Sequence, residues 1–208
     1  MTQKLVMLLS TEAGSSPAEL LFGSTPLLSC PEFPFDENSS SHQLSLAEIA
    51  LRTEQLADCH RLMSRALRCL SNESRALTSQ EWLLLAGVSL LNGNVESCEH
   101  QLQMVTRGLQ HVSDRPTREL LRQRIVVIRS VLAGIDSPEA GLEELLTVFR
   151  FLGTTRCHEL CEQALRVREI LLKWKGDDGD YEASAQRPAS DATWHIQRGA
   201  DVGNPEWN

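Results

Sequence analysis

The stretch from Trp82 to Leu109 places the strongest constraint on what this chain can fold into. Two apolar runs at helical spacing are separated there by Leu91-Asn92-Gly93-Asn94. Gly93 is the residue best able to take the left-handed backbone conformation that ends a helix, and the two asparagines tolerate it too. Amphipathic helices joined by so short a loop pack antiparallel. The sequence therefore predicts an αα-hairpin, with further helices stacked on it.

The start of this hairpin and its two apolar faces follow from residue spacing. Thr78 and Glu81 have the spacing of a capping box, in which each side chain satisfies a backbone N–H group of the first turn. The first helix presents an apolar or small stripe, made of Trp82, Leu85, Ala86, Ser89 and Leu90. The second helix is expected to bury Val95, Cys98, Leu102, Val105 and Leu109.

These positions resemble a tetratricopeptide repeat. That pattern has a Trp, a Leu and a small residue in its first helix, a glycine at the turn, and small and apolar residues in its second helix. The matching residues here are Trp82, Leu85, Ala86, Gly93, Cys98, Leu102 and Val105. Any tight αα-hairpin needs similar residues, so a generic hairpin is the alternative. The resemblance implies a helical array whose groove binds a peptide or helix of a partner protein.

Composition and charge narrow the classes of function. Aromatic residues make up only 5% of the chain and strand-like alternation is absent, which favours an all-α protein. Of the net charge of -8, residues 1–45 carry -4 and residues 176–208 carry -5, which leaves +1 for residues 46–175. A protein that binds a phosphate backbone needs a basic face. Nucleic acid is therefore not expected as a partner.

Three regions differ in composition. Residues 1–44 are rich in Ser, Pro and Gly, so we expect a disordered acidic arm; a linear motif around Phe33 and Phe35 is the alternative. Residues 45–175 are expected to form the helical, repeat-like domain. Residues 176–208 lack periodicity and are expected to be a disordered acidic tail, in which Trp194 and Trp207 are alternative docking anchors.

About six helices are expected in the central region. Ser45 and Glu48 have capping-box spacing and precede an apolar pattern that runs to about residue 70. A repeat frame through Ala47, Cys59, Met63 and Ala66 is conceivable, but no turn signal stands near Glu54, so one long helix is predicted. After the hairpin, helices are expected to start near Pro116 and Pro138 and after Thr154 or Thr155; the last runs to Trp174.

The six cysteines favour a reducing compartment, the cytoplasm or the nucleus. They are Cys30, Cys59, Cys69, Cys98, Cys157 and Cys161. Most lie on apolar helix stripes, where a reduced thiol packs as a small hydrophobic group. The apolar run near Leu5 is too short for a signal peptide, and no run approaches the length of a membrane span. Neither secretion nor membrane insertion is therefore expected.

Few residue patterns suggest chemistry. Cys157, His158 and Cys161 lie within one helical turn, but zinc needs four ligands, and the second pair, Cys59-His60, lies on an apolar stripe. The sequence has no glycine-rich phosphate loop and no nucleophile elbow. We therefore expect no enzyme, no cofactor, no metal and no small-molecule substrate.

Two further resemblances bear on binding. Leu142-Glu-Glu-Leu145-Leu146 is similar to the box by which coregulators bind nuclear receptors, but these leucines form the only apolar stripe of their helix, so core packing is expected. The stretch from Leu46 to Met63, followed by Leu77 to Glu81, looks like two helices of 14-3-3 proteins. That family grips phosphoserine with an Arg-Tyr pair, whereas the only tyrosine here is Tyr181 in the acidic tail. A scaffold or adaptor subunit of a larger complex is the function expected, with a peptide-binding module or a coregulator as alternatives.

Overall fold

Helices account for all the regular structure that the computed structural model describes, which covers residues 16–28, 36, 38–152 and 158–185. Side chains are described except at 148–152, 158–161 and 176–185. This confirms the all-α prediction. The helices are α2 (Pro17–Phe22), α3 (Ser40–Arg52), α4 (Leu56–Glu73), α5 (Ser79–Leu91), α6 (Val95–Gly108), α7 (Arg115–Asp136), α8 (Pro138–Leu152) and α9 (His158–Ala185), with a short 3-10 helix η1 (Leu109–His111) after α6.

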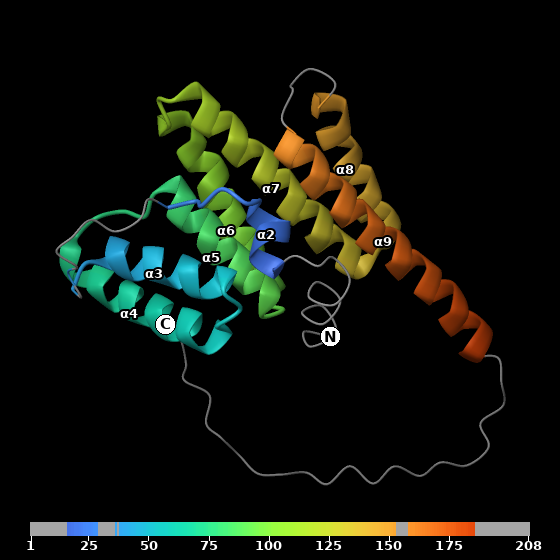
Figure 1. Ribbon diagram of the computed structural model, residues 1–208, viewed down its shortest axis with the longest axis horizontal. Helices are drawn as coiled ribbons and strands as arrows, with labels where there is room; N and C mark the ends of the chain where they lie inside the picture. The colour runs from blue at the N-terminus through green and yellow to red at the C-terminus, as the bar shows by residue number, and fades with distance from the viewer. Residues whose placement is uncertain (1–15, 29–35, 37, 153–157, 186–208) are drawn as a thin grey trace, which may run out of the picture.

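Antiparallel hairpins are the building unit. Helices α3 and α4, α5 and α6, and α7 and α8 pair through connections of three residues or fewer, and α9 packs against both α7 and α8 (Figure 1). The predicted helix starts are confirmed at three helices. Thr78 and Glu81 form a complete capping box at α5, Asp114 caps α7, and the Ser137 hydroxyl accepts from the amide of Ala140 at α8.

The long helix predicted from Ser45 to about residue 70 is wrong, because the chain reverses direction between α3 and α4. Glu54 takes a left-handed conformation with φ 60°. Its amide donates to the carbonyl of Leu51, and the amide of Gln55 donates to the carbonyl of Ala50. These two hydrogen bonds are the pair that terminates a helix in the Schellman motif. This helix end therefore has a common hydrogen-bond geometry, but a glutamate occupies the left-handed position that glycine usually takes.

The predicted start of the first long helix is also wrong. The helix begins at Ser40 with Ser39 as its N-cap, and Ser45 lies inside it, where its hydroxyl donates to the carbonyl of Ser41. Glu48 consequently does not act in a capping box. Its carboxylate instead accepts from the amides of Leu27 and Leu28.

Helices extend beyond residues 45–175 at both ends. Residues 17–22 form α2, whose side chains Ala18, Leu20, Leu21 and Phe22 are fully buried, so the expectation that residues 1–44 contribute nothing to a packed core is wrong for this part. At the other end α9 continues past Trp174 to Ala185. The motif around Phe33 and Phe35, the caps at Thr154 or Thr155, and the anchors Trp194 and Trp207 lie outside the described residues.

Helix α5 lies at the centre of the core. Ten of its residues are buried, and the eight apolar ones lie on all sides of the helix: Leu83, Leu84, Leu85, Ala86, Gly87, Val88, Leu90 and Leu91. A helix that is apolar all round is one that other elements cover completely. Its neighbours include α6, α7 and α2, and α2 also contacts α3, α7 and α9 (Figure 1). Helix α2 therefore lies between the α3–α4 hairpin and the rest of the molecule.

Candidate protein-docking groove

The residues that resemble a tetratricopeptide repeat build the interior of the α5–α6 hairpin. Leu85, Ala86, Cys98, Leu102 and Val105 are all buried. Gly93 has φ 70° and ends α5 with the same pair of hydrogen bonds that ends α3. Trp82 is half-buried, and its ring meets the exposed His100 ring edge to face at 6.5 Å. These residues pack the two helices of the hairpin against each other.

The described side chains form an apolar groove elsewhere, between α8 and α9. Two local features position its walls. Pro138 at the first position of α8 follows the capping Ser137, so the chain turns directly out of α7. Gly141 then brings α8 close to α7, because a Cβ atom there would lie 2.6 Å from the carbonyl oxygen of Ser130. Helix α8 therefore packs closely against α7, and α9 packs against both helices.

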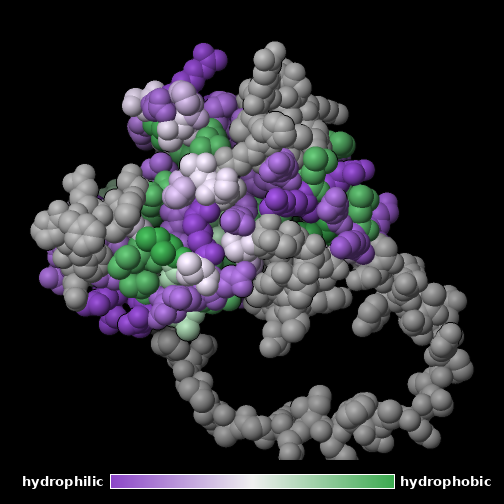
Figure 2. Space-filling view, in the orientation of Figure 1, coloured by the Kyte–Doolittle hydropathy of each residue, from purple (hydrophilic) through white to green (hydrophobic). Residues whose placement is uncertain are grey.

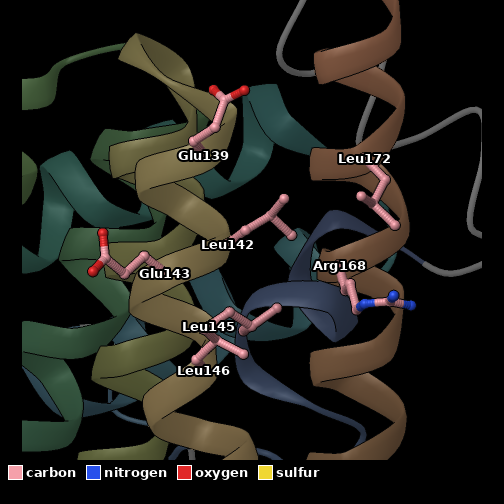
Figure 3. Close-up of a pocket in the computed structure, with 7 residues that line it drawn as sticks. All are labelled: Glu139, Leu142, Glu143, Leu145, Leu146, Arg168 and Leu172. Carbon is pink, nitrogen blue, oxygen red and sulfur yellow. The ribbon is translucent and has the colours of Figure 1, made fainter.

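Leucines form the floor of this groove. Leu142, Leu145 and Leu146 of α8 and Leu172 of α9 lie between the two helices (Figure 3). Leu145 is fully buried, whereas Leu146 is 51% and Leu172 41% exposed. The groove has a volume of about 500 Å³. Leu165, which is 44% exposed, lies seven residues before Leu172 and so extends the same apolar line along α9.

Charged groups stand at the edges of the groove and not on its floor. Glu143 on α8 and Arg168 on α9 point away from the space between the helices (Figure 3). At one end, Lys175 pairs with Glu139 at 3.2 Å. Hydrogen bonds from its own backbone amide and from Lys175 hold the pKa of Glu139 below its ordinary value. The charged lining residues are thus acidic on α8, Glu139 and Glu143, and basic on α9, Arg168, with leucines between them (Figure 3). Figure 2 shows hydrophobic residues among hydrophilic ones on the visible face of the molecule.

Sequence reasoning missed this groove because it assigned Leu142, Leu145 and Leu146 together to the core. The structure separates them: Leu145 is buried, Leu142 is half-buried and Leu146 is exposed. On α9, Leu165 and Leu172 are exposed too. A signal was present, because Leu165 and Leu172 do not share a face with the buried Val167, Ile170, Leu171 and Trp174. A helix with two separate apolar faces can bury both of them only if each face packs against a different element or molecule.

The thiols and histidines form no reactive or metal-binding group in the described part of the chain. Cys59 and Cys98 are buried, and burial raises the pKa of each thiol to about 12, so both thiols stay protonated and unreactive. Among the residues described, no three His, Cys, Asp or Glu side chains gather to hold a metal ion. Cys157 and the side chain of Cys161 lie outside those residues.

No protein-family model matches the chain, and no curated protein or solved structure is significantly similar to it. Of the helices that the structure describes, none is both long and apolar enough to span a bilayer.

Proposed function

We propose that this chain is a non-enzymatic scaffold or adaptor that binds an amphipathic helix of a partner protein in the α8–α9 groove. The observation that carries the proposal is the exposure of Leu146, Leu165 and Leu172 along a groove whose floor is apolar. Soluble proteins rarely leave a continuous apolar patch uncovered unless it serves as a binding surface. A third helix can pack its apolar face into the groove between two antiparallel helices.

The charged residues at the edges of the groove indicate which charges a partner helix should carry. A helix bound in the groove would lie along Glu143 on one side and Arg168 on the other. Its apolar stripe would therefore be flanked by basic residues on one side and acidic residues on the other. Such charges select the partner and its direction more than they add affinity.

Other features agree with a binding role. The α3–α4 hairpin repeats the frame of α5–α6, because Ala47, Glu54, Cys59 and Met63 precede Ala86, Gly93, Cys98 and Leu102 by the same 39 residues. That recurrence supports a tetratricopeptide-like array, although α2 lies between the hairpins. The buried Leu145 argues against the coregulator box, which needs all three of its leucines exposed. Reduced, buried thiols fit a cytoplasmic or nuclear protein.

Substitution of the floor leucines tests the proposal. We expect Leu146→Asp combined with Leu172→Asp to weaken binding of a partner helix by more than a hundredfold, since each buried leucine contributes about 1.5–3 kcal/mol. Leu67→Asp is the matched control, because Leu67 is 40% exposed on α4, away from the groove. Partners captured from cells by the full chain identify candidate helices, whose synthetic peptides are then titrated by calorimetry.

Support requires that a helical peptide bind the wild type and the Leu67→Asp variant but not the groove variant. Affinity should change little between low and high salt, because the contact is mainly apolar. Equal binding by both variants would rule out the groove as the site. Strongly salt-sensitive binding of a phosphopeptide would favour the alternative of a phosphopeptide-binding module.

A further inference from the structure

The N-terminal end of the described chain is buried among helices that lie far from it in the sequence. The N-terminal segment, residues 16–28, consists of α2 followed by a non-helical run to Leu28. It lies among α3, α5, α7 and α9, four helices that are separated from one another in the sequence (Figure 1). We call the residues of these helices that contact the segment, Glu48, Arg52, Gly87, Arg124 and Gln163, the central cleft.

The segment inserts its side chains into the central cleft as anchors. Leu20, Leu21 and Phe22 have no exposed surface. Phe22 is accommodated by a glycine on α5, since a Cβ atom on Gly87 would lie 2.1 Å from the tip of the Phe22 ring. The Ser16 hydroxyl accepts from the amide of Glu19 and so caps the short helix. The surrounding helices therefore accommodate consecutive large apolar side chains of the segment.

Side chains of the cleft hold the backbone that follows α2. Both carboxylate oxygens of Glu48 on α3 accept backbone amides, from Leu27 at 2.7 Å and from Leu28 at 2.8 Å. The Arg52 guanidinium donates to the carbonyls of Gly23 and Thr25, each at 2.9 Å. Arg52 also pairs with Glu48 at 2.9 Å, so the two groups hold each other in position.

Two more buried polar side chains, from helices distant in the sequence, also bind the backbone of the segment. Arg124 on α7 donates to the carbonyl of Thr25 at 3.0 Å. Gln163 on α9 donates to the carbonyl of Leu20 at 2.7 Å. Glu48, Arg124 and Gln163 are each at least 95% buried. Burying such groups is costly unless they are hydrogen-bonded, and here each of them binds the backbone of one short segment.

This is the pattern of a peptide-binding site: backbone groups are held by fixed polar side chains and a few anchors fill apolar pockets. We propose that the central cleft is a binding site for short peptides and that the N-terminal segment is its ligand, bound in cis. Its ligand class is a capped single helical turn with consecutive Leu-Leu-Phe, followed by a glycine and a non-helical run. The proposal concerns a different site from the α8–α9 groove and does not depend on it.

Cutting the covalent link between ligand and site tests the proposal. A protease recognition sequence replaces residues 29–35 of the full chain, and the purified protein is cut there. We expect the cut protein to keep its helical circular-dichroism signal and to exchange the released segment for a fluorescent peptide of residues 13–30, seen as a rise in anisotropy. The uncut protein should not take up the labelled peptide, because its cleft is filled.

Two variants establish which contacts hold the ligand. A peptide carrying Phe22→Asp should fail to compete, and Glu48→Gln in the cut protein should weaken peptide binding at least tenfold, because a buried amide loses its charged acceptor. Glu96→Gln on the exposed face of α6 is the matched control and should bind as the wild type does. The Glu48→Gln protein is required to match the wild-type helical signal before cutting.

Three outcomes would overturn the proposal. The first is loss of the helical signal on cutting, which would make the segment an inseparable part of the core. The second is a cut protein that stays helical but never exchanges its segment after extended dilution with excess labelled peptide. The third is competition by the Phe22→Asp peptide as strong as that by the wild-type peptide.

Discussion

At the scale of single residues, Glu54 and Gly93 perform the same task with different side chains. Both are left-handed, with φ 60° and 70°, and each ends the first helix of a hairpin with the same pair of backbone hydrogen bonds. Glycine takes this conformation freely, whereas a residue with a Cβ atom loses about 1 kcal/mol or more in doing so. The packing of α3 against α4 therefore holds Glu54 in a strained conformation.

Glu54→Gly should accordingly stabilise the protein. We expect a gain of about 0.5–1 kcal/mol in the free energy of unfolding, since relief of strain exceeds the added entropy of the unfolded chain. The melting temperature should rise by about 1–4 °C. Gly93→Ala makes the reverse change at the equivalent turn and should lower it by a similar amount. A Glu54→Gly protein that melts below the wild type would show that the Glu54 conformation is not strained.

At the scale of elements, one ionic cluster joins α3, α4 and α5. The Arg75 guanidinium lies between Glu73 at 2.9 Å and Glu81 at 2.8 Å, and both Arg75 and Glu73 also contact the hydroxyl of the buried Ser40. Glu81 completes the capping box of α5 by accepting from the amide of Thr78. The cluster thus ties the end of α4 to the starts of α3 and α5.

This cluster makes stability depend on acid pH. Burial by itself would raise the pKa of Glu81, but hydrogen bonds from Arg75 and Thr78 outweigh it and lower that pKa below 4.5. Hydrogen bonds from Ser40 lower the pKa of Glu73. Carboxyls with a depressed folded pKa stabilise the protein above their ordinary value, and this contribution is lost as the pH falls through the folded value.

We therefore expect the melting temperature to fall steeply below about pH 4.5. Glu81→Gln should melt lower than the wild type at neutral pH and show a shallower fall in acid, because one of the titrating groups is gone. The comparison uses thermal melts at matched ionic strength from about pH 6 to about pH 3, with the exposed Glu96→Gln as control. Identical acid slopes in Glu81→Gln and the wild type would contradict this role of the cluster.

At the scale of the whole molecule, burial is unevenly shared. Helix α5 is covered on all sides, whereas α4 buries only Cys59, Met63 and Ala66. Helix α2 touches α3, α5, α7 and α9, so the α3–α4 hairpin depends in part on α2 for its attachment. Among the side chains that the structure describes, the exposed large apolar residues on α8 and α9 are Leu146, Leu165 and Leu172, and those on α3 and α4 are Ile49 and Leu67.

Hydrogen exchange should reproduce this order. We expect the backbone amides of residues 83–91 to exchange most slowly, because opening α5 requires separating most of the core, while those of α4 should exchange faster. Mass spectrometry of peptic fragments measures both helices in one experiment. Protection of α4 equal to that of α5 would show that the hairpins open together as one unit.

Features built from neighbouring residues could be predicted from the sequence. The caps at Thr78, Asp114 and Ser137 and the turn at Gly93 depend on residues three or four positions apart, so their signals are local. The break at Glu54 escaped prediction because a left-handed glutamate carries no such signal. The candidate groove was not predicted either. An apolar stripe in the sequence indicates that a leucine can be buried, but it does not indicate which element will cover that leucine.

The sequence by itself determined that this chain is helical, where α5, α7 and α8 begin, and that α5 and α6 form a hairpin. Only the tertiary structure decided that Leu146 and Leu172 face outward, and that Glu48, Arg124 and Gln163 meet around the N-terminal segment. The physical reason is range: helix periodicity, caps and turns act within a few residues. Burial and hydrogen bonding of the N-terminal segment, in contrast, join residues separated by as much as 143 positions.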